Sequence, residues 1–475
     1  MSQAIHIFKK DVERLRYHLA LTLLAVVAFC WVSAANVSGP GPTVLVLAVS
    51  WWFLIAAVIH LEPLPGTGHF WLTRPYRRSS LFVAKALFII TFVNVSLGVA
   101  DLIILHARGF PVFANAGGLI WAQVLLVCAF EIPVAAIVSV TSGLLAFLTA
   151  TLILLLITLA SYLLTSTLHI SLAWGHIEWV REYVVLSLAF IIGAGILYWQ
   201  YAHRATLLSR VAALAGPILL FICAAAFPWT IAFALQSWLF PSRAQTSTIS
   251  VRLDTEQEWA GQLYRDDKDR LIADIPITIH GTPSGTDLKV YGVRMTLSAP
   301  DGRTLPIEEP PSNSFETDSS RVSLRLVVPE RWYQKYRREA LRAKGILYFA
   351  LCDEPRYLAI HPSKDRVGVP GVGLCTVNAK SFVCSSALRP SANYVEADLT
   401  ERSTRGVVHS NARWAGSGDT TPFPAAFNID PVFRWSIPTL APITDVVIAR
   451  SEPIAYAVRS FDLGRVVLAD FRMQN

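Results

Sequence analysis

The first half of the chain is a succession of long apolar runs separated by short turns. About seven runs are long enough to cross the roughly 30 Å hydrocarbon core of a bilayer, which needs about 20 residues of helix. The predicted spans are Leu19–Ala35, Thr43–Ile59, Leu81–Leu105, Leu119–Val140, Leu144–Leu164, Tyr183–Tyr201 and Val211–Leu239. The last run is long and contains Pro217 and Pro228. Because proline removes a backbone donor, we expect this helix to kink at one of them.

The second half alternates apolar and polar residues with a period of two, which is typical of strands with one buried face. The alternation is clearest over residues 249–253, 293–297 and 322–326, and Ile346–Cys352 and Arg465–Phe471 are predicted as further strands. Many short strands in about 235 residues favour a β-sandwich or a pair of small β-domains.

One helix is expected among these strands, over Pro329–Lys344. Proline suits the first turn of a helix, and Gly345 supplies a stop at its end. The whole chain is therefore predicted to be an all-α membrane bundle of about seven transmembrane helices, followed by a mainly-β, sandwich-like domain. The predicted divisions are 1–18, an amphipathic interfacial helix; 19–205, a six-span core; 206–240, a seventh span; and 241–475, the β-rich domain.

The charge distribution follows the same division. Residues 1–240 contain 12 Lys or Arg and only 7 Asp or Glu, whereas residues 241–475 contain 29 and 27. Acids are scarce where lipid is the solvent, and the second half has the charge density of a soluble domain. The net charge of +7 lies mainly in loops of the membrane half, so it indicates no nucleic-acid partner.

Lysine and arginine in short loops predict the orientation, because they favour the cytoplasmic side. Nine of them precede the first span, join spans two and three, or join spans six and seven, and only Arg108 and Arg181 lie in loops on the other side. The N-terminus is therefore expected in the cytoplasm. An odd number of spans then places residues 241–475 outside the cell membrane, and a miscount by one span would reverse this placement.

Polar side chains inside the predicted spans are candidate functional residues. They are Asn94, Asp101, Gln123 and Glu131. A lone carboxylate in lipid is costly, so Glu131 should face a helix interface, a water-filled cavity or a partner, and both a structural and a pathway role stay open. Asn94 and Gln123 are expected to join helices by hydrogen bonds. Asp101 lies near the outer end of its span, where we expect it to be hydrated.

The cysteines and the search for catalytic motifs point to no catalytic site. Cys375 and Cys384 bracket a short loop and are candidates for a disulfide in an oxidising compartment, while Cys352 is expected to be a free thiol in the core. We find no phosphate-binding loop, no G-x-S-x-G, no CxxC and no HExxH. The chain is therefore expected to be no enzyme and to hold no metal or cofactor.

The segment between spans two and three, residues 61–80, is rich in glycine, proline and aromatic residues. Phe70 and Trp71 are costly to expose, so they should dock on headgroups or on a partner protein. Three arginines beside them supply charged donors, and Lys85 is expected to snorkel at the base of the third span. The candidate contact residues of this loop are Gly66, Thr67, Phe70, Trp71, Arg74, Pro75, Arg77 and Arg78.

The stretch Phe70–Lys85 resembles the "W-x-x-R-P-[IY]-[ST]-R…L…A-K" segment of permease subunits of type-2 ATP-binding-cassette exporters. The start of the chain fits this resemblance, because Ile5, Phe8, Val12 and Leu15 follow helical spacing on one face. The resemblance covers roughly residues 1–205 and implies a multi-pass protein of a bacterial cytoplasmic (inner) membrane. A seventh span and a periplasmic β-domain depart from the pattern.

The resemblance also implies a mechanism. The chain would bind no nucleotide itself, and a separate cytoplasmic ATP-binding-cassette ATPase would contact the 61–80 loop. A second permease chain, identical or different, would complete the transport path. The alternative is a membrane-anchored outer domain that binds or assembles other proteins without a transport path. Nothing in the spans identifies the transported substrate.

Overall fold

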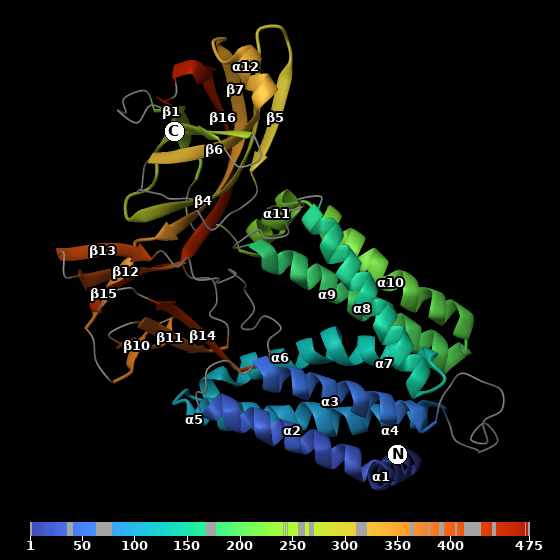
Figure 1. Ribbon diagram of the computed structural model, residues 1–475. Helices are drawn as coiled ribbons and strands as arrows, with labels where there is room; N and C mark the ends of the chain where they lie inside the picture. The colour runs from blue at the N-terminus through green and yellow to red at the C-terminus, as the bar shows by residue number, and fades with distance from the viewer. Residues whose placement is uncertain are drawn as a thin grey trace.

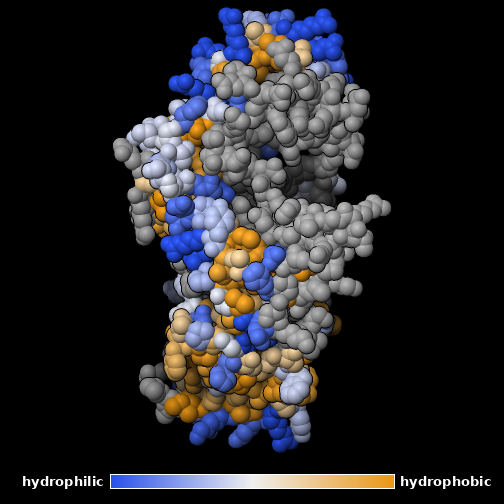
Figure 2. All heavy atoms as spheres, turned by 90° about the vertical axis from the view of Figure 1, so that its left-hand side faces the viewer, coloured by the Kyte–Doolittle hydropathy of each residue, from blue (hydrophilic) through white to orange (hydrophobic). Residues whose placement is uncertain are grey.

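In the computed structural model, the N-terminal half forms a bundle of helices and the C-terminal half forms sheets at one end of that bundle (Figure 1). Hydrophobic residues gather over the lower part of Figure 2, where the helices lie, and hydrophilic residues over the strands above. The structure describes residues 2–35, 41–62, 78–167, 177–240, 242, 244, 246–254, 262–265, 270–309, 321–361, 365–370, 372–378, 381–388, 394–403, 406–412, 429–438, 443–470 and 472–473.

Seven of the described helices are long and apolar enough to cross a membrane, which confirms the prediction of a multi-pass protein. We number them spans 1 to 7 in chain order. They run Arg16–Ala34, Gly41–His60, Ser79–Ala107, Phe113–Val140, Leu144–Thr165, Glu178–His203 and Thr206–Ala226. A separate helix, α1 (Ser2–Arg14), precedes span 1.

Several spans are made of more than one helical segment. Span 1 is α2 (Arg16–Ala34), span 2 is α3 (Gly41–His60), span 5 lies in α8 (Leu144–Thr167) and span 7 is α10 (Thr206–Ala226). Span 3 joins α4 (Arg78–Ile89) to α5 (Ser96–Ala107), and span 4 joins α6 (Ala116–Leu126) to α7 (Ile132–Val140). Span 6 begins with α9 (Glu178–Tyr198).

The last predicted span is wrong in extent. The helix ends at Ala226, and Phe227 and Pro228 are extended before a short helix, α11 (Trp229–Leu239). Proline at position 228 disfavours a helical conformation at the residue before it, which explains the break. Pro217 stays inside α10. Residues 206–240 are therefore one membrane-length helix and a second helix that packs on the strands.

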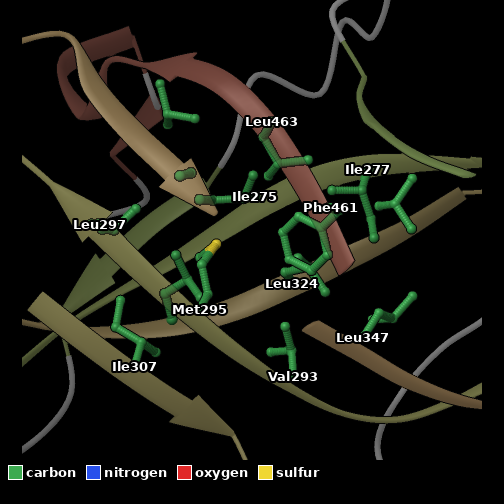
Figure 3. Packing of buried hydrophobic residues seen from close by; sticks show 14 of the residues in the cluster. Ile275, Ile277, Val293, Met295, Leu297, Ile307, Leu324, Leu347, Phe461 and Leu463 are labelled. Carbon is green, nitrogen blue, oxygen red and sulfur yellow. The ribbon is translucent and has the colours of Figure 1, made fainter. Parts of the chain in front are cut away.

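The strands form two sandwiches with separate cores. In the first, the sheet β1–β3–β2–β17, joined by β6, faces the sheet β16–β7–β4–β5. Apolar side chains from both sheets fill the space between them, as Figure 3 shows for Ile275, Met295, Leu324 and Phe461. The strands are β1 (Ser250–Leu253), β2 (Gln262–Arg265), β3 (Arg270–His280), β4 (Thr286–Ser298), β5 (Thr304–Glu309), β6 (Arg321–Pro329), β7 (Leu341–Asp353), β16 (Pro453–Val466) and β17 (Arg472–Met473).

The second sandwich is inserted between β7 and β16, which pair with each other in the first. Its sheets are β14–β11–β10–β9 and β13–β12–β15–β8. Cys375 and Cys384 lie opposite each other on β10 and β11 and form a disulfide in its core. The strands are β8 (Arg356–Ile360), β9 (Val367–Val369), β10 (Gly373–Asn378), β11 (Ser381–Ala387), β12 (Tyr394–Ser403), β13 (Gly406–Ala412), β14 (Val432–Pro438) and β15 (Ile443–Ser451).

Two predictions for single elements of the β region were wrong. The helix expected over Pro329–Lys344 is α12 (Glu330–Tyr336) only, because Leu341 and Ala343 alternate into the first core as the start of β7. The strand expected over Arg465–Phe471 belongs to β16 up to Val466, and a turn of 3-10 helix follows at Leu468–Asp470.

Both sandwiches are fixed to the helices. On the first, Trp229 and Phe233 of α11 insert among Tyr291, Tyr348 and Tyr456, with the ring centroids of Trp229 and Tyr348 4.7 Å apart. On the second, the buried side chains of Leu388 and Val432 join the core of the bundle near Phe110. A terminal guanidinium nitrogen of Arg366 donates to the carbonyl of Arg108 at 3.1 Å. The β region therefore meets the bundle at two separate places.

Candidate functional site

The four polar residues predicted inside the spans form two pairs between spans 3 and 4. Nδ2 of Asn94 donates to Oε1 of Glu131 at 2.6 Å, and both side chains are buried. Nε2 of Gln123 donates to Oδ2 of Asp101 at 3.3 Å. The structure thus gives Glu131 a hydrogen-bonding partner at a helix interface. It also buries Asp101, at 3% exposure, so the expected hydration of this carboxyl group is wrong.

Asn94 and Glu131 both lie in π-helical segments. Span 3 contains one at Ile90–Val95, span 4 contains one at Val127–Glu131, and span 6 ends in a third at Trp199–His203. Such segments carry an extra residue per turn and are frequent at functional sites. Here they bring two polar side chains of neighbouring spans to hydrogen-bonding distance in the middle of the bundle.

The Asn94–Glu131 pair predicts different results for two substitutions of Glu131. Glu131→Gln keeps an acceptor oxygen, so we expect a change of less than about 1 kcal/mol in unfolding free energy. Glu131→Leu leaves the Asn94 amide buried without its acceptor, and we expect a loss of about 1–3 kcal/mol. Thermal unfolding of the purified variants measures both, and equal stability of the two variants would contradict this role for the pair.

A second polar site lies at the end of the bundle next to α1, and sequence reasoning missed it. Nζ of Lys85, on α4, lies 2.8 Å from Oδ2 of Asp11 and 3.1 Å from Oε2 of Glu62. Lys10 joins the same group, because its Nζ lies 2.9 Å from Oε1 of Glu62. Lys85, Asp11 and Glu62 are at most 5% exposed. We call Lys10, Asp11, Glu62 and Lys85 the ion-pair cluster.

The packing of α1 on α4 buries Asp11 and Lys85 of the ion-pair cluster, whereas Lys10 stays partly exposed. Ala4 and Ile7 of α1 are buried against Leu81 and Ala84 of α4. The face of α1 that turns inward is therefore not entirely the one predicted, since Ile5 is 42% exposed. Lys85 does not snorkel as expected, because two carboxylates within the protein satisfy its charge.

The two carboxyl groups of the cluster respond oppositely to this environment. Burial raises the pKa of Asp11 above its ordinary value, although Lys85 opposes the change. Burial also pushes the pKa of Glu62 upward, but the ammonium groups of Lys85 and Lys10 outweigh it and hold that pKa below its ordinary value. Glu62 is therefore the carboxylate that the two lysines stabilise in its charged form.

One sequence signal could have pointed to this cluster. The first 240 residues contain only seven acidic residues. An acidic side chain in or near the membrane is costly, so each of the seven is expected to have a partner or a functional role. Asp11, Glu62 and Lys85 lie on three elements that are far apart in the sequence, and no local pattern shows that they meet. The packing of α1 on α4 brings Asp11 to Lys85, and the packing of span 2 against span 3 brings Glu62 there.

The predicted coupling loop lies mostly outside the described residues. Gly66, Thr67, Phe70, Trp71, Arg74, Pro75 and Arg77 are not described, and Arg78 is described only as the first residue of α4. What the structure does describe is the two ends of this loop. Glu62 follows span 2, Lys85 belongs to the start of span 3, and both are in the ion-pair cluster.

Within the described residues, no group of three or more His, Cys, Asp and Glu side chains is arranged to hold a metal ion. The contacts that the structure shows at the two polar sites are hydrogen bonds and ion pairs between helices. Comparison with known proteins finds no family model and no curated protein that matches this chain.

Proposed function

We propose that the chain is a membrane-spanning permease subunit of an ATP-driven export system. In this proposal a separate cytoplasmic ATPase contacts the loop between spans 2 and 3, and a second permease chain completes the path. The observation that carries the proposal is the ion-pair cluster. It fixes both ends of the loop to each other and to α1.

The cluster supports coupling because it makes one rigid unit of three elements. A loop attached to two independent helices could move without moving either span. Here, displacement of the loop acts on Glu62 and Lys85, which are tied by a buried ion pair of 3.1 Å. Spans 2 and 3 and α1 would then move together, as a coupling element with two discrete arrangements requires.

The intramembrane pairs extend this connection to span 4. Asn94 and Asp101 lie on span 3, and their partners Glu131 and Gln123 lie on span 4. Asn94 is nine residues beyond Lys85, about 13 Å along the helix. A movement of the inner end of span 3 therefore reaches a polar contact with span 4 inside the membrane. We propose that this contact rearranges during transport.

The proposed location is the cytoplasmic membrane of a bacterium, with the β region on the outer side. The distribution of lysine and arginine supports this orientation. The disulfide Cys375–Cys384 agrees with it, because disulfides persist in oxidising compartments such as the periplasm.

Substitution of the predicted contact residues tests the proposal. Trp and Arg are typical hot-spot residues, and losing each costs about 2 kcal/mol or more. Trp71→Ala with Arg74→Ala should therefore weaken ATPase association at least ~100-fold while membrane insertion is retained. The measurement is affinity purification of the tagged chain from its native membrane, followed by identification and quantification of the ATPase.

A matched control has the same two changes elsewhere on the bundle. Trp31 is 75% exposed and Arg16 is exposed, so Trp31→Ala with Arg16→Ala should leave the association unchanged. If the unmodified chain brings down no ATPase, the exporter proposal fails. The role of a membrane-anchored binding or assembly protein would then be the better account of the outer sandwiches.

A further inference from the structure

A cavity of about 240 Å³ opens among α7, α8 and α10, and none of its lining residues belongs to either polar site described above. The residues that line its two ends differ in polarity. Thr141, Ser142 and Arg210 line one end, at the short turn between spans 4 and 5. The rest is lined by aliphatic side chains.

The apolar part of the cavity extends along span 5. Ala146, Ala150 and Leu154 of α8 lie at intervals of four residues, on one face of the helix. Leu154 is thus about 12 Å further along the axis than Ala146. Ala213 of α10 is on the other wall. The alanines leave the gap between the helices unfilled, and water has no partners in such a gap.

The polar end carries a positive charge that no acid among the described residues neutralises. Nε of Arg210 donates to the carbonyl of Val140, the last residue of α7, at 3.2 Å. Its side chain is exposed, and no acid among the described residues pairs with it. A guanidinium has five N–H donors, so four remain for an oxyanion. Ser142 is exposed beside the cavity and adds a hydroxyl donor.

We propose that this cavity binds an anionic phospholipid of the bilayer. The phosphate group would be held by Arg210 and Ser142, and part of an acyl chain would occupy the space beside Ala146, Ala150 and Leu154. The arrangement matches a phospholipid in two respects. It has a cationic end at the membrane surface and an apolar channel running toward the membrane centre. The inference does not depend on the exporter proposal.

Lipid binding to the delipidated full chain tests this assignment. Native mass spectrometry would compare phosphatidylglycerol, phosphatidylcholine and inorganic phosphate as probes. A single well-placed cation near the membrane surface strengthens the binding of an anionic lipid roughly fivefold. We therefore expect the unmodified chain to prefer phosphatidylglycerol to phosphatidylcholine about fivefold. Arg210→Gln should remove that preference, and Arg16→Gln, an exposed arginine at the same side of the bundle, should keep it.

A second variant tests the apolar part. Ala150→Phe fills the channel and should reduce binding of both lipids. Leu152→Phe, on the same helix at a 55% exposed position outside the cavity lining, should not. Size-exclusion profiles identify variants that fail to fold.

Four results would overturn the proposal. The first three are equal binding of both lipids by the unmodified chain, an unchanged preference in Arg210→Gln, and unchanged lipid binding in a folded Ala150→Phe. Displacement of phosphatidylglycerol by equimolar inorganic phosphate would also overturn it, because the site would then be one for a free anion.

Discussion

Replacing Lys85 by methionine is expected to lower the free energy of unfolding by about 3–5 kcal/mol. The substitution leaves Asp11 and Glu62 buried without the ammonium group that lies 2.8 and 3.1 Å from them. Methionine has a similar length, so the effect comes from the lost ion pairs, above all that of Asp11, and not from a cavity. Unfolding of the purified protein in detergent, followed by tryptophan fluorescence, measures the loss.

Lys10 provides the matched control for Lys85. It pairs with the same Glu62 at 2.9 Å, but its side chain is 22% exposed. Because a partly exposed pair is screened by water, Lys10→Met should cost no more than about 1 kcal/mol. If the two variants lose equal stability, the ion-pair cluster does not hold α1 to spans 2 and 3, and the proposed route of coupling loses its support.

Phe233→Ala is expected to loosen the attachment of the first sandwich to the bundle. The ring is fully buried and makes edge-on contacts with Tyr291, Tyr348 and Tyr456 at centroid distances of 5.6, 5.3 and 6.0 Å. Truncating a buried phenylalanine costs about 3–5 kcal/mol. We expect faster hydrogen exchange in α11 and in the strand segments that carry the three tyrosines.

Phe240→Ala is the corresponding control, because Phe240 is only partly buried in the same cluster. We expect it to leave exchange in β4 and β7 close to that of the unmodified chain. Unchanged exchange in Phe233→Ala would mean that α11 does not anchor the sandwich. The contacts of the second sandwich with the bundle, at Leu388, Val432 and Arg366, would then be the more important attachment of the β region among the described residues.

The spans could be predicted from the sequence because each is a local property. A run of about 20 apolar residues has one stable state in lipid, whatever surrounds it. The boundary at Pro228 was harder, since Trp229–Leu239 is as apolar as a span and continues the hydrophobic run of span 7, but forms a separate helix of 11 residues that packs on tyrosines from three strands. Hydropathy cannot distinguish lipid from an aromatic surface of the protein.

The polar sites illustrate a second limit. Asn94, Asp101, Gln123 and Glu131 could be selected as unusual residues in lipid, but their pairing depends on how spans 3 and 4 face each other. The π-helical segments that carry two of them leave no local signal in hydropathy. The ion-pair cluster was missed because it joins residues 11, 62 and 85, which only the tertiary fold brings together.

The β region shows the same limit at the boundary between the helix α12 and the strand β7. Proline and glycine at the two ends of residues 329–344 predicted one helix, whereas Arg342 and Lys344 lie on the outer face of β7 and pair with Asp462 of β16. The pattern Leu341, Arg342, Ala343, Lys344 already has a period of two. Proline and glycine at the ends of the segment outweighed it in the prediction.

Sidedness is the claim on which the coupling loop and the outer placement of the sandwiches both depend. Labelling with a membrane-impermeant maleimide in intact spheroplasts tests it directly, using single cysteines at two exposed positions, Glu13 on α1 and Thr304 on β5. We predict that Thr304→Cys is labelled at once and Glu13→Cys only after permeabilisation. Labelling of Glu13→Cys alone in intact spheroplasts would contradict the account.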